Sequence, residues 1–257
     1  VAASKLKKAQ DRMQNIKPYA EGLSTSIQNL LPNINLNDIN LASNFTESDK
    51  TLVLAISSNR GLCGGFNANV FKKIQTSINH KNIEVIGVGK KAADLFQRNK
   101  YTVSKVEANI MDNPTFTQSK VISQEIMNSF IQGSWSKVVI VYNTFKNAAT
   151  QLVVQKQLLP ISIEDGEVQQ RKDYIFDPDK TTIVNSLIPN QVHTQFFEAI
   201  LNSFASEHGA RMTAMHKATD NANELKQNLT LSYNRQRQAA ITNEILEIVA
   251  GAEALSD

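Results

Sequence analysis

The sequence has little of the chemistry that most enzymes and secreted proteins require. Among 257 residues there is one cysteine, Cys63, so no intramolecular disulfide can form and a reducing compartment is favoured. The four histidines are scattered, and no His/Cys cluster has the spacing of a zinc site. A formal net charge of +3 is too small to predict nucleic-acid binding. No apolar run reaches the length of a membrane-spanning helix.

The glycine patterns that bind phosphate are also missing. No GK[ST] motif occurs, and Gly87 and Gly89 form only a G-x-G fragment that lysines continue. The turn GLCGGFN that follows an apolar run lacks the G-x-G-x-x-G spacing as well. We therefore expect this turn to serve close strand–helix packing, not a dinucleotide. Cys63 in the turn lacks an identifiable histidine base, so we expect a small buried cysteine instead of a nucleophile.

Proline is absent after Pro189, and the only glycines beyond it are Gly209 and Gly251. This predicts a continuous helix over residues 186–257, with a length on the order of 100 Å. Charged residues such as Arg211 and Asp220 exclude a membrane span there. Apolar and small residues recur in an imperfect heptad, interrupted between 204 and 212 and between 229 and 241: Phe197, Leu201, Phe204, Met212, Met215, Ala218, Ala222, Leu225, Leu229, Ile241, Ile245, Ile248, Ala252 and Leu255.

A second helix is predicted over residues 1–30. Its apolar residues alternate by three and four positions, as in a two-stranded seam: Leu6, Ala9, Met13, Ile16, Ala20, Leu23, Ile27 and Leu30. The two chain ends are thus expected to form an antiparallel coiled coil; a homodimeric coiled coil is the alternative. Because the chain opens within the helical pattern, without a methionine or a capping residue, we expect the natural protein to begin earlier.

An α/β domain is predicted between these helices, over residues 51–180, after an Asn-, Ser- and Asp-rich linker at 31–50. Strands are expected at 51–57, 84–89, 101–106, 137–145 and 150–160, and the first of them is expected to be buried. Helices are expected after the glycine turn, at 90–99 and at 116–133, the last with Asp112, Asn113 and Pro114 as start signals. The alternation indicates a mostly parallel, Rossmann-like sheet with helices on both faces, closed by an antiparallel hairpin.

Two motifs carry a resemblance to a known family. The stretch Ser58–Asn67, SNRGLCGGFN, is similar to a glycine signature of the gamma subunit of F-type ATP synthases. The C-terminal signature of the same family is similar to two later stretches, ARMTAMHKATDNANEL and LTLSYNRQRQAAITNEILEIVAGAEAL. The opening VAASKLKKAQ resembles the family's first helix. The resemblance implies a non-catalytic rotor shaft without a cofactor, which couples rotation of the membrane ring to conformational change in the catalytic subunits.

The resemblance also implies partners and contact residues. The partners would be a ring of three alpha and three beta subunits, the epsilon subunit and the membrane c-subunit ring, with one copy of this chain per complex. The location would be peripheral, at the cytoplasmic face of a bacterial inner membrane. Ile245–Leu255, including Ile248, would form an apolar bearing, and Tyr174 and Asp177 would lie in the foot that meets the membrane ring and epsilon. Polar contacts to the catalytic subunits would be made by Arg211, Arg237, Gln238, Thr242 and Glu244.

Two other functions fit the same patterns. The α/β domain could belong to a nucleotide- or cofactor-dependent enzyme, which would bind ATP or NAD tightly as an isolated chain. The terminal helices could form a free-standing scaffold, which would associate into a symmetric homodimer. A rotor subunit instead predicts a single copy in a larger assembly.

Replacing Cys63 with Ala tests the role of the only thiol. If the cysteine only fills space in the turn, ATP hydrolysis and ATP-driven proton pumping by the assembled complex stay largely intact. Both activities are measured in reconstituted vesicles. Complete loss of activity in this variant would restore the nucleophile interpretation.

Overall fold

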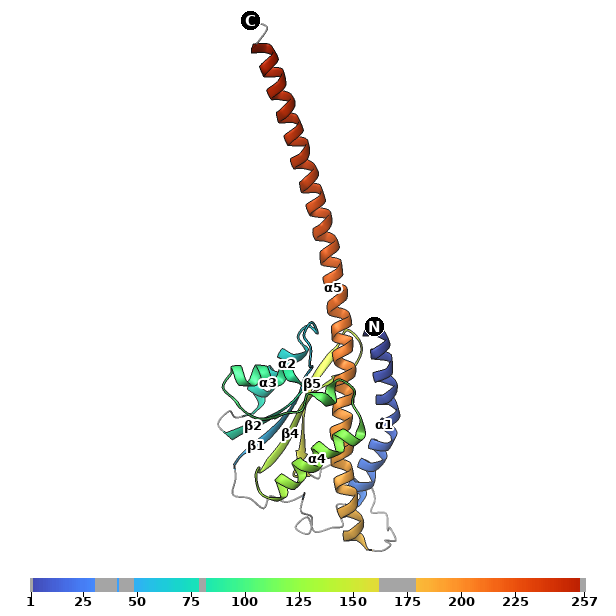
Figure 1. Ribbon diagram of the computed structural model, residues 1–257. Coiled ribbons are helices and arrows are strands. Elements are labelled where there is room, and N and C mark those ends of the chain that lie inside the picture. Colours follow the sequence, from blue (N-terminus) through green and yellow to red (C-terminus); the bar gives the residue numbers. More distant parts are fainter. Residues whose placement is uncertain (1, 31–40, 42–48, 79–81, 162–178, 255–257) are drawn as a thin grey trace. The chain divides into compact units, whose positions relative to one another are not determined.

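The computed structural model describes residues 2–30, 41, 49–78, 82–161 and 179–254. The chain divides into two compact units, Val1–Thr213 and Ala214–Asp257, which we call unit 1 and unit 2. Unit 1 holds a five-stranded sheet with helices on both of its faces (Figure 1). Unit 2 holds only the C-terminal part of one long helix. Among the described residues, no helix has both the length and the apolar character that a bilayer span requires.

The sheet contains all five strands that the sequence predicts. These are β1 (Thr51–Ile56), β2 (Ile83–Val88), β3 (Thr102–Val106), β4 (Lys137–Phe145) and β5 (Gln151–Leu159). Their order is β3-β2-β1-β4-β5. The pairs β1–β2, β1–β4 and β2–β3 are parallel, and β4 and β5 form the predicted antiparallel hairpin. The mostly parallel sheet is confirmed.

Two apolar cores lie on opposite faces of this sheet. Helices α2 (Phe66–Ser77) and α3 (Lys90–Arg98) cover one face, where Val53 and Ala55 of β1 point. Helix α4 (Phe116–Ile131) covers the other face together with α1 (Ala2–Leu30) and the first part of α5 (Lys180–Ala254). Because β1 is buried on both faces, its sequence is a continuous apolar run without alternation.

Helix α1 packs against α5 in the predicted antiparallel direction. Leu6 near the start of α1 shares a buried cluster with Ala205, whereas Ile27 near its end shares one with Val184. All eight residues of the predicted seam of α1 are buried or half-buried, and the residues between them are mostly exposed. The three- and four-residue spacing thus identified the packed face of this helix correctly.

The start of α5 and the capping residue of α4 differ from the predicted ones, whereas α4 starts at Phe116 as predicted. Helix α5 begins at Lys180 and not at 186, because Asp179 accepts hydrogen bonds from the backbone N–H (2.9 Å) and the hydroxyl (2.6 Å) of Thr182. Helix α4 is capped by Thr115, whose hydroxyl accepts the N–H of Gln118. Asp112 lies before this cap and instead accepts a hydrogen bond from Asn59.

The segment predicted as a linker contributes to the core. Leu41 is buried in the cluster that holds α1, α4 and α5 together. Its carbonyl accepts a hydrogen bond of 3.0 Å from the N–H of Ile161. Polar composition predicted a loop here, but a single apolar residue is sufficient to attach such a loop to a core.

Gly209 is expected to be required for close packing in α5, unlike Gly22 in α1. A Cβ at position 209 would lie 3.2 Å from Cε2 of Phe145 and 3.3 Å from Cα of Ala148, whereas a Cβ at position 22 meets nothing within 4 Å. Gly22→Ala should therefore raise the free energy of unfolding by about 0.5–1 kcal/mol through helix propensity. Gly209→Ala should show no such gain, or a loss, in denaturant unfolding followed by the fluorescence of Trp135. An equal gain in both variants would contradict the tight packing at Gly209.

Candidate subunit interface on the C-terminal helix

The surface of unit 2 is the first candidate site, because its helix is exposed all round. From Met215 to Ala252 every residue except Asn234 is exposed. Large apolar side chains share this exposure: Met215, Leu225, Leu229, Leu231, Tyr233, Ile241, Ile245, Leu246, Ile248 and Val249. A soluble protein rarely leaves so much contiguous apolar surface in water unless it binds a partner.

Most of these side chains form two stripes on different sides of the helix, and Leu231, Leu246 and Val249 lie outside both. The first stripe follows three- and four-residue steps from Met215 through Ala218, Ala222, Leu225 and Leu229 to Tyr233. The second consists of Ile241, Ile245, Ile248 and Ala252. At about 100° per residue, the second stripe is rotated by roughly 120° from the first. The break in the heptad that the sequence shows after Leu229 is therefore a rotation of the apolar face around the helix.

The first stripe includes a shallow groove. Ala222, Leu225, Leu229 and Tyr233 form its apolar part, and Lys226 and Thr230 its polar part. Apolar anchors bordered by polar groups are the usual composition of a surface that binds a protein partner.

Four of the predicted polar contact residues lie beside the second stripe. Arg237, Gln238, Thr242 and Glu244 are all exposed. Thr242 donates its hydroxyl to the carbonyl oxygen of Gln238 at 2.9 Å, a bond within the helix. Their contact with other subunits stays a prediction. Tyr174 and Asp177, predicted in the foot, lie outside the described residues.

Arg211 is placed differently, inside unit 1. Its side chain is only 12% exposed and forms a 2.7 Å ion pair with Glu207, one turn earlier on α5. It also donates hydrogen bonds to the carbonyl oxygens of Arg60 (3.2 Å) and Gly61 in the glycine turn. Burial raises the pKa of Glu207 and the charge of Arg211 opposes this shift. The predicted contact of Arg211 with the catalytic subunits remains untested, but its guanidinium already binds this turn.

The glycine turn Ser58–Asn67 is held from within by side chains. The amide of Asn67 donates to Oγ of Ser58 at 2.8 Å and to Sγ of Cys63 at 3.3 Å, and its carbonyl oxygen accepts the N–H of Ser58. Cys63 is 2% exposed and packs against Phe66 and Ala210. The prediction of a small buried cysteine is confirmed. Leu62 has a φ of 61° and is 79% exposed, an unusual combination for a leucine.

Gly87 and Gly89 have structural roles that explain the G-x-G fragment. Gly89 has a φ of 106°, and a Cβ there would lie 2.2 Å from the carbonyl oxygen of Ser57. At Gly87 a Cβ would lie 3.2 Å from Cβ of Ala93. The glycines thus permit the end of β2 to approach β1 and α3. Close packing accounts for both positions, although the sequence pattern predicts it at the glycine turn. There a Cβ at Gly61 or Gly64 would meet nothing within 4 Å.

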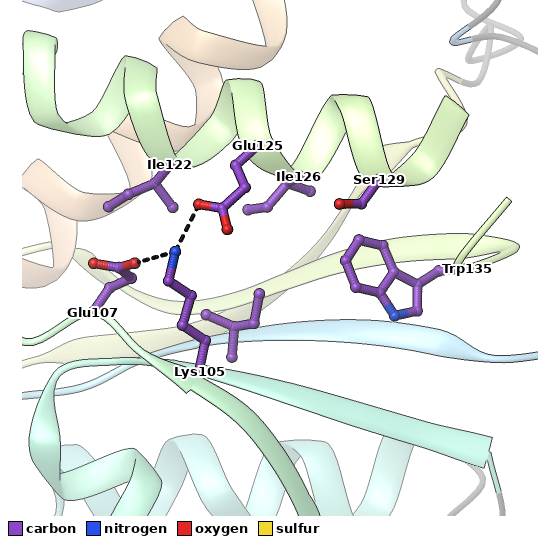
Figure 2. Close-up of a pocket in the computed structure, with 8 residues that line it drawn as sticks. Lys105, Glu107, Ile122, Glu125, Ile126, Ser129 and Trp135 are labelled. Atoms are coloured by element: carbon purple, nitrogen blue, oxygen red, sulfur yellow. Dashed lines mark hydrogen bonds and ion pairs between the residues drawn. The ribbon is translucent and has the colours of Figure 1, made fainter. Parts of the chain in front are cut away.

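A small pocket between β3 and α4 is lined by charged side chains that pair with one another. Figure 2 shows the ammonium of Lys105 between Glu107 and Glu125, at 3.0 and 2.6 Å. Hydrogen bonds to Glu125 and Glu107 raise the pKa of Lys105. Trp135 lines the same pocket and donates its indole N–H to Glu84 at 2.8 Å. This cluster ties the edge strand to α4; partly exposed ion pairs of this kind contribute little stability.

Sequence reasoning missed one residue that positions Arg211. Glu207 belongs to no motif that was singled out from the sequence, yet it is 6% exposed and forms an ion pair with Arg211. The signal was its spacing, since Glu and Arg four positions apart on a helix pair readily.

His208 should make unit 1 sensitive to acid. Its ring contacts Phe204 edge-on, with ring centroids 4.6 Å apart. Burial, and then the charges of Arg211 and Lys5, lower the pKa of His208 from 6.5 to about 4. Between these values the unfolded chain binds a proton that the folded chain does not, so the free energy of unfolding decreases as the pH falls from 6.5 to about 4, by up to about 3 kcal/mol.

The measurement compares denaturant unfolding of the unaltered chain and of His208→Asn across this pH range. The raised pKa of Glu207 acts in the opposite direction, because its contribution decreases as the pH rises. It is present in both proteins, so the difference between them isolates His208. Equal acid sensitivity in the two proteins would contradict the lowered pKa.

Comparisons with known proteins agree with this architecture. The sequence model of a family described as "ATP synthase" matches residues 1–255. The chain is 48% identical to the "ATP synthase gamma chain" of Christiangramia forsetii over 263 residues, covering 100% of this chain and 91% of the relative. It is 47% identical to the chain of the same name from Flavobacterium psychrophilum over 262 residues, covering 99% and 90%.

A solved structure shows the same fold. A chain in the cryo-EM structure of the Euglena gracilis mitochondrial ATP synthase, "OSCP/F1/c-ring, rotational state 3", superposes with a TM-score of 0.68 at 24% identity, covering 99% of this chain and 93% of that one. The full-length family match and the two bacterial relatives confirm the resemblance that the glycine turn and the C-terminal motif carry. The chain belongs to the ATP synthase gamma-chain family.

Proposed function

We propose that the exposed helix of unit 2 is the surface through which this chain, the non-catalytic rotor subunit of an F-type ATP synthase, acts on the catalytic subunits. One observation carries this proposal. From Met215 to Ala252 the helix exposes two apolar stripes that unit 2 itself does not cover. A chain that functions without partners would bury such side chains, because each stabilises the folded state by about 1.5–3 kcal/mol when it is removed from water.

The difference between the two stripes supplies the asymmetry that a rotor needs. A surrounding partner meets Leu225 and Leu229 on one side of the helix and Ile245 and Ile248 on another. Identical subunits placed around the helix therefore contact different side chains at any one angle. A ligand or a shaft shifts the conformational equilibrium of a partner only if it binds the partner's two conformations with different affinity. The two stripes provide such different contacts.

The second stripe suits a bearing. Ile241, Ile245, Ile248 and Ala252 offer no hydrogen-bonding groups that would have to break at each step of rotation. The polar residues beside it, Arg237, Gln238, Thr242 and Glu244, can make the directional contacts that distinguish one angle from the next. In this arrangement the apolar stripe supports the rotating helix, and the flanking polar groups couple its rotation to the conformation of the catalytic subunits.

The finer assignments are also proposals. The catalytic partners would be the alpha and beta subunits, with epsilon and the membrane c-subunit ring at the other end of a rotor present in one copy. Tyr174 and Asp177 would belong to that end. The two relatives named above, at 48% and 47% identity, are bacterial, which supports a peripheral location at the cytoplasmic face of a bacterial inner membrane over the mitochondrial matrix. ATP hydrolysis would occur on the beta subunits.

Placing charge on the second stripe tests the bearing. Ile245→Asp together with Ile248→Asp should weaken assembly or reduce ATP-driven proton pumping, because two carboxylates would enter an apolar contact. The matched control is Ala239→Asp with Asn243→Asp, which adds two aspartates on the opposite side of the same helix. Pumping is measured with the reconstituted complex in vesicles. Unchanged pumping in the Ile245/Ile248 double variant would count against the bearing.

A further inference from the structure

Residues Ser203–Thr213 of α5 are enclosed by other parts of unit 1, and we call this stretch and its contacts the collar. Three segments that are distant in the sequence meet it. They are the end of the β4–β5 hairpin at 143–148, the glycine turn, and the beginning of α1. The collar ends where unit 1 ends, and the residues beyond it are the exposed ones of unit 2.

On the hairpin side, two buried serines of α5 form hydrogen bonds with backbone groups of β4, as a neighbouring strand would do. The pairing of β1 with β4 ends at Val141. Just beyond it, Ser203 accepts the backbone N–H of Asn143 and Ser206 donates to the carbonyl of Asn143, both at 3.1 Å. Thr213 donates to the carbonyl of Ala148 at 2.9 Å. These bonds attach α5 to the sheet's backbone and not to flexible side chains.

On the second side, Arg211 binds the glycine turn. Its hydrogen bonds to the carbonyls of Arg60 and Gly61 are made by a guanidinium that Glu207 neutralises. Ionised donors form stronger hydrogen bonds than neutral ones. Because Glu207 and Arg211 are both largely buried, the pair is costly to separate.

On the third side, α1 closes the collar with apolar contacts. Leu6 and Ala9 are buried in a cluster with Ala205, and Met212 packs against it. At about 100° per residue, the serine, arginine and alanine faces are separated by roughly 120° around the helix. Gly209 permits the hairpin to approach closely. A helix held by backbone hydrogen bonds on two sides and by packing on the third resists both rotation about its axis and sliding along it.

We propose that the collar is the joint at which torque passes between the α/β domain and α5, with Arg211 as its main positioning residue. This inference rests on the rotor function proposed above. It assigns to Arg211 and Glu207 a role inside the chain, in addition to any contact with other subunits. It also explains why serine and threonine hydroxyls occupy a helix face that packing alone would fill with alanine.

The test uses the assembled complex in vesicles, with protons pumped per ATP hydrolysed as the readout. Arg211→Met, and separately Ser203→Ala with Ser206→Ala, should leave ATP hydrolysis measurable but lower this ratio by about half or more, because a loosened joint slips under load. The matched control is Ser186→Ala, which removes an exposed hydroxyl that bonds to the carbonyl of Ile183 in its own helix. Its ratio should equal that of the unaltered complex.

A second readout separates positioning from general stability. In Arg211→Met, hydrogen exchange at the N–H groups of Ser58 and Phe66 in the glycine turn should accelerate by about tenfold or more, while the core strands stay protected. Arg211→Lys keeps the charge beside Glu207 and should restore part of both the protection and the pumping ratio. Native mass and the fluorescence of Trp135 verify that each variant is folded and assembled.

The outcomes distinguish this inference from the rotor function itself. If the unaltered chain does not enter a complex with larger subunits, the rotor function fails. If the unaltered complex pumps and the ratio is unchanged in both the Arg211 and the serine variants, the collar is not the torque joint although the rotor function stands. A reduced ratio together with faster exchange in the glycine turn supports the collar.

Discussion

The structure depends on one property of the α-helix, which is that it satisfies its own backbone hydrogen bonds. Helix α5 can therefore continue from a packed environment into an exposed one without leaving peptide groups unpaired. A strand leaving the sheet could not do so. Yet an isolated helix of ordinary composition is only marginally stable in water, and its apolar stripes remain uncovered. The same helix that makes unit 1 stable makes unit 2 dependent on partners.

The two parts of α5 differ in what they require of their side chains. From Val184 to Ala210 the helix is largely buried, and its surface is complementary to the sheet, α4 and α1. From Met215 onward it presents exposed residues in every direction. The collar lies between these two regimes, where small and hydroxylated residues replace large apolar ones. One helix, α5, thus includes both the exposed residues proposed to rotate against partner subunits and the collar residues that hydrogen bonds hold in place.

Much of this architecture could be predicted from the sequence because it depends on local patterns. Short segments rich in apolar and β-branched residues identified the five strands, and the alternating spacing of Leu6, Ala9 and Ile27 identified the packed face of α1. The glycine turn and C-terminal motif identified the family. Helix starts were less certain because caps compete: Thr115 caps α4, while Asp112 binds Asn59.

The parts that could not be predicted depend on tertiary proximity. Nothing in the spacing of residues 31–50 indicates that Leu41 reaches the core. Arg211 and Gly61 are separated by 150 positions, and only the folded sheet brings the turn to the helix. The exposed polar residues of unit 2, such as Arg237 and Glu244, are the opposite case. Their proposed role depends on other chains, so neither their spacing nor this fold determines what they contact.

The most direct measurement is the native mass of this chain co-expressed with alpha and beta subunits. A rotor whose apolar stripes are covered by a surrounding ring predicts a complex that contains one copy of this chain and six larger subunits. Dissociation of that complex should release the chain in an aggregation-prone form, because the stripes return to water. A chain that emerges alone and stable, or as a symmetric homodimer, would contradict the central claim that unit 2 exists to be enclosed by other subunits.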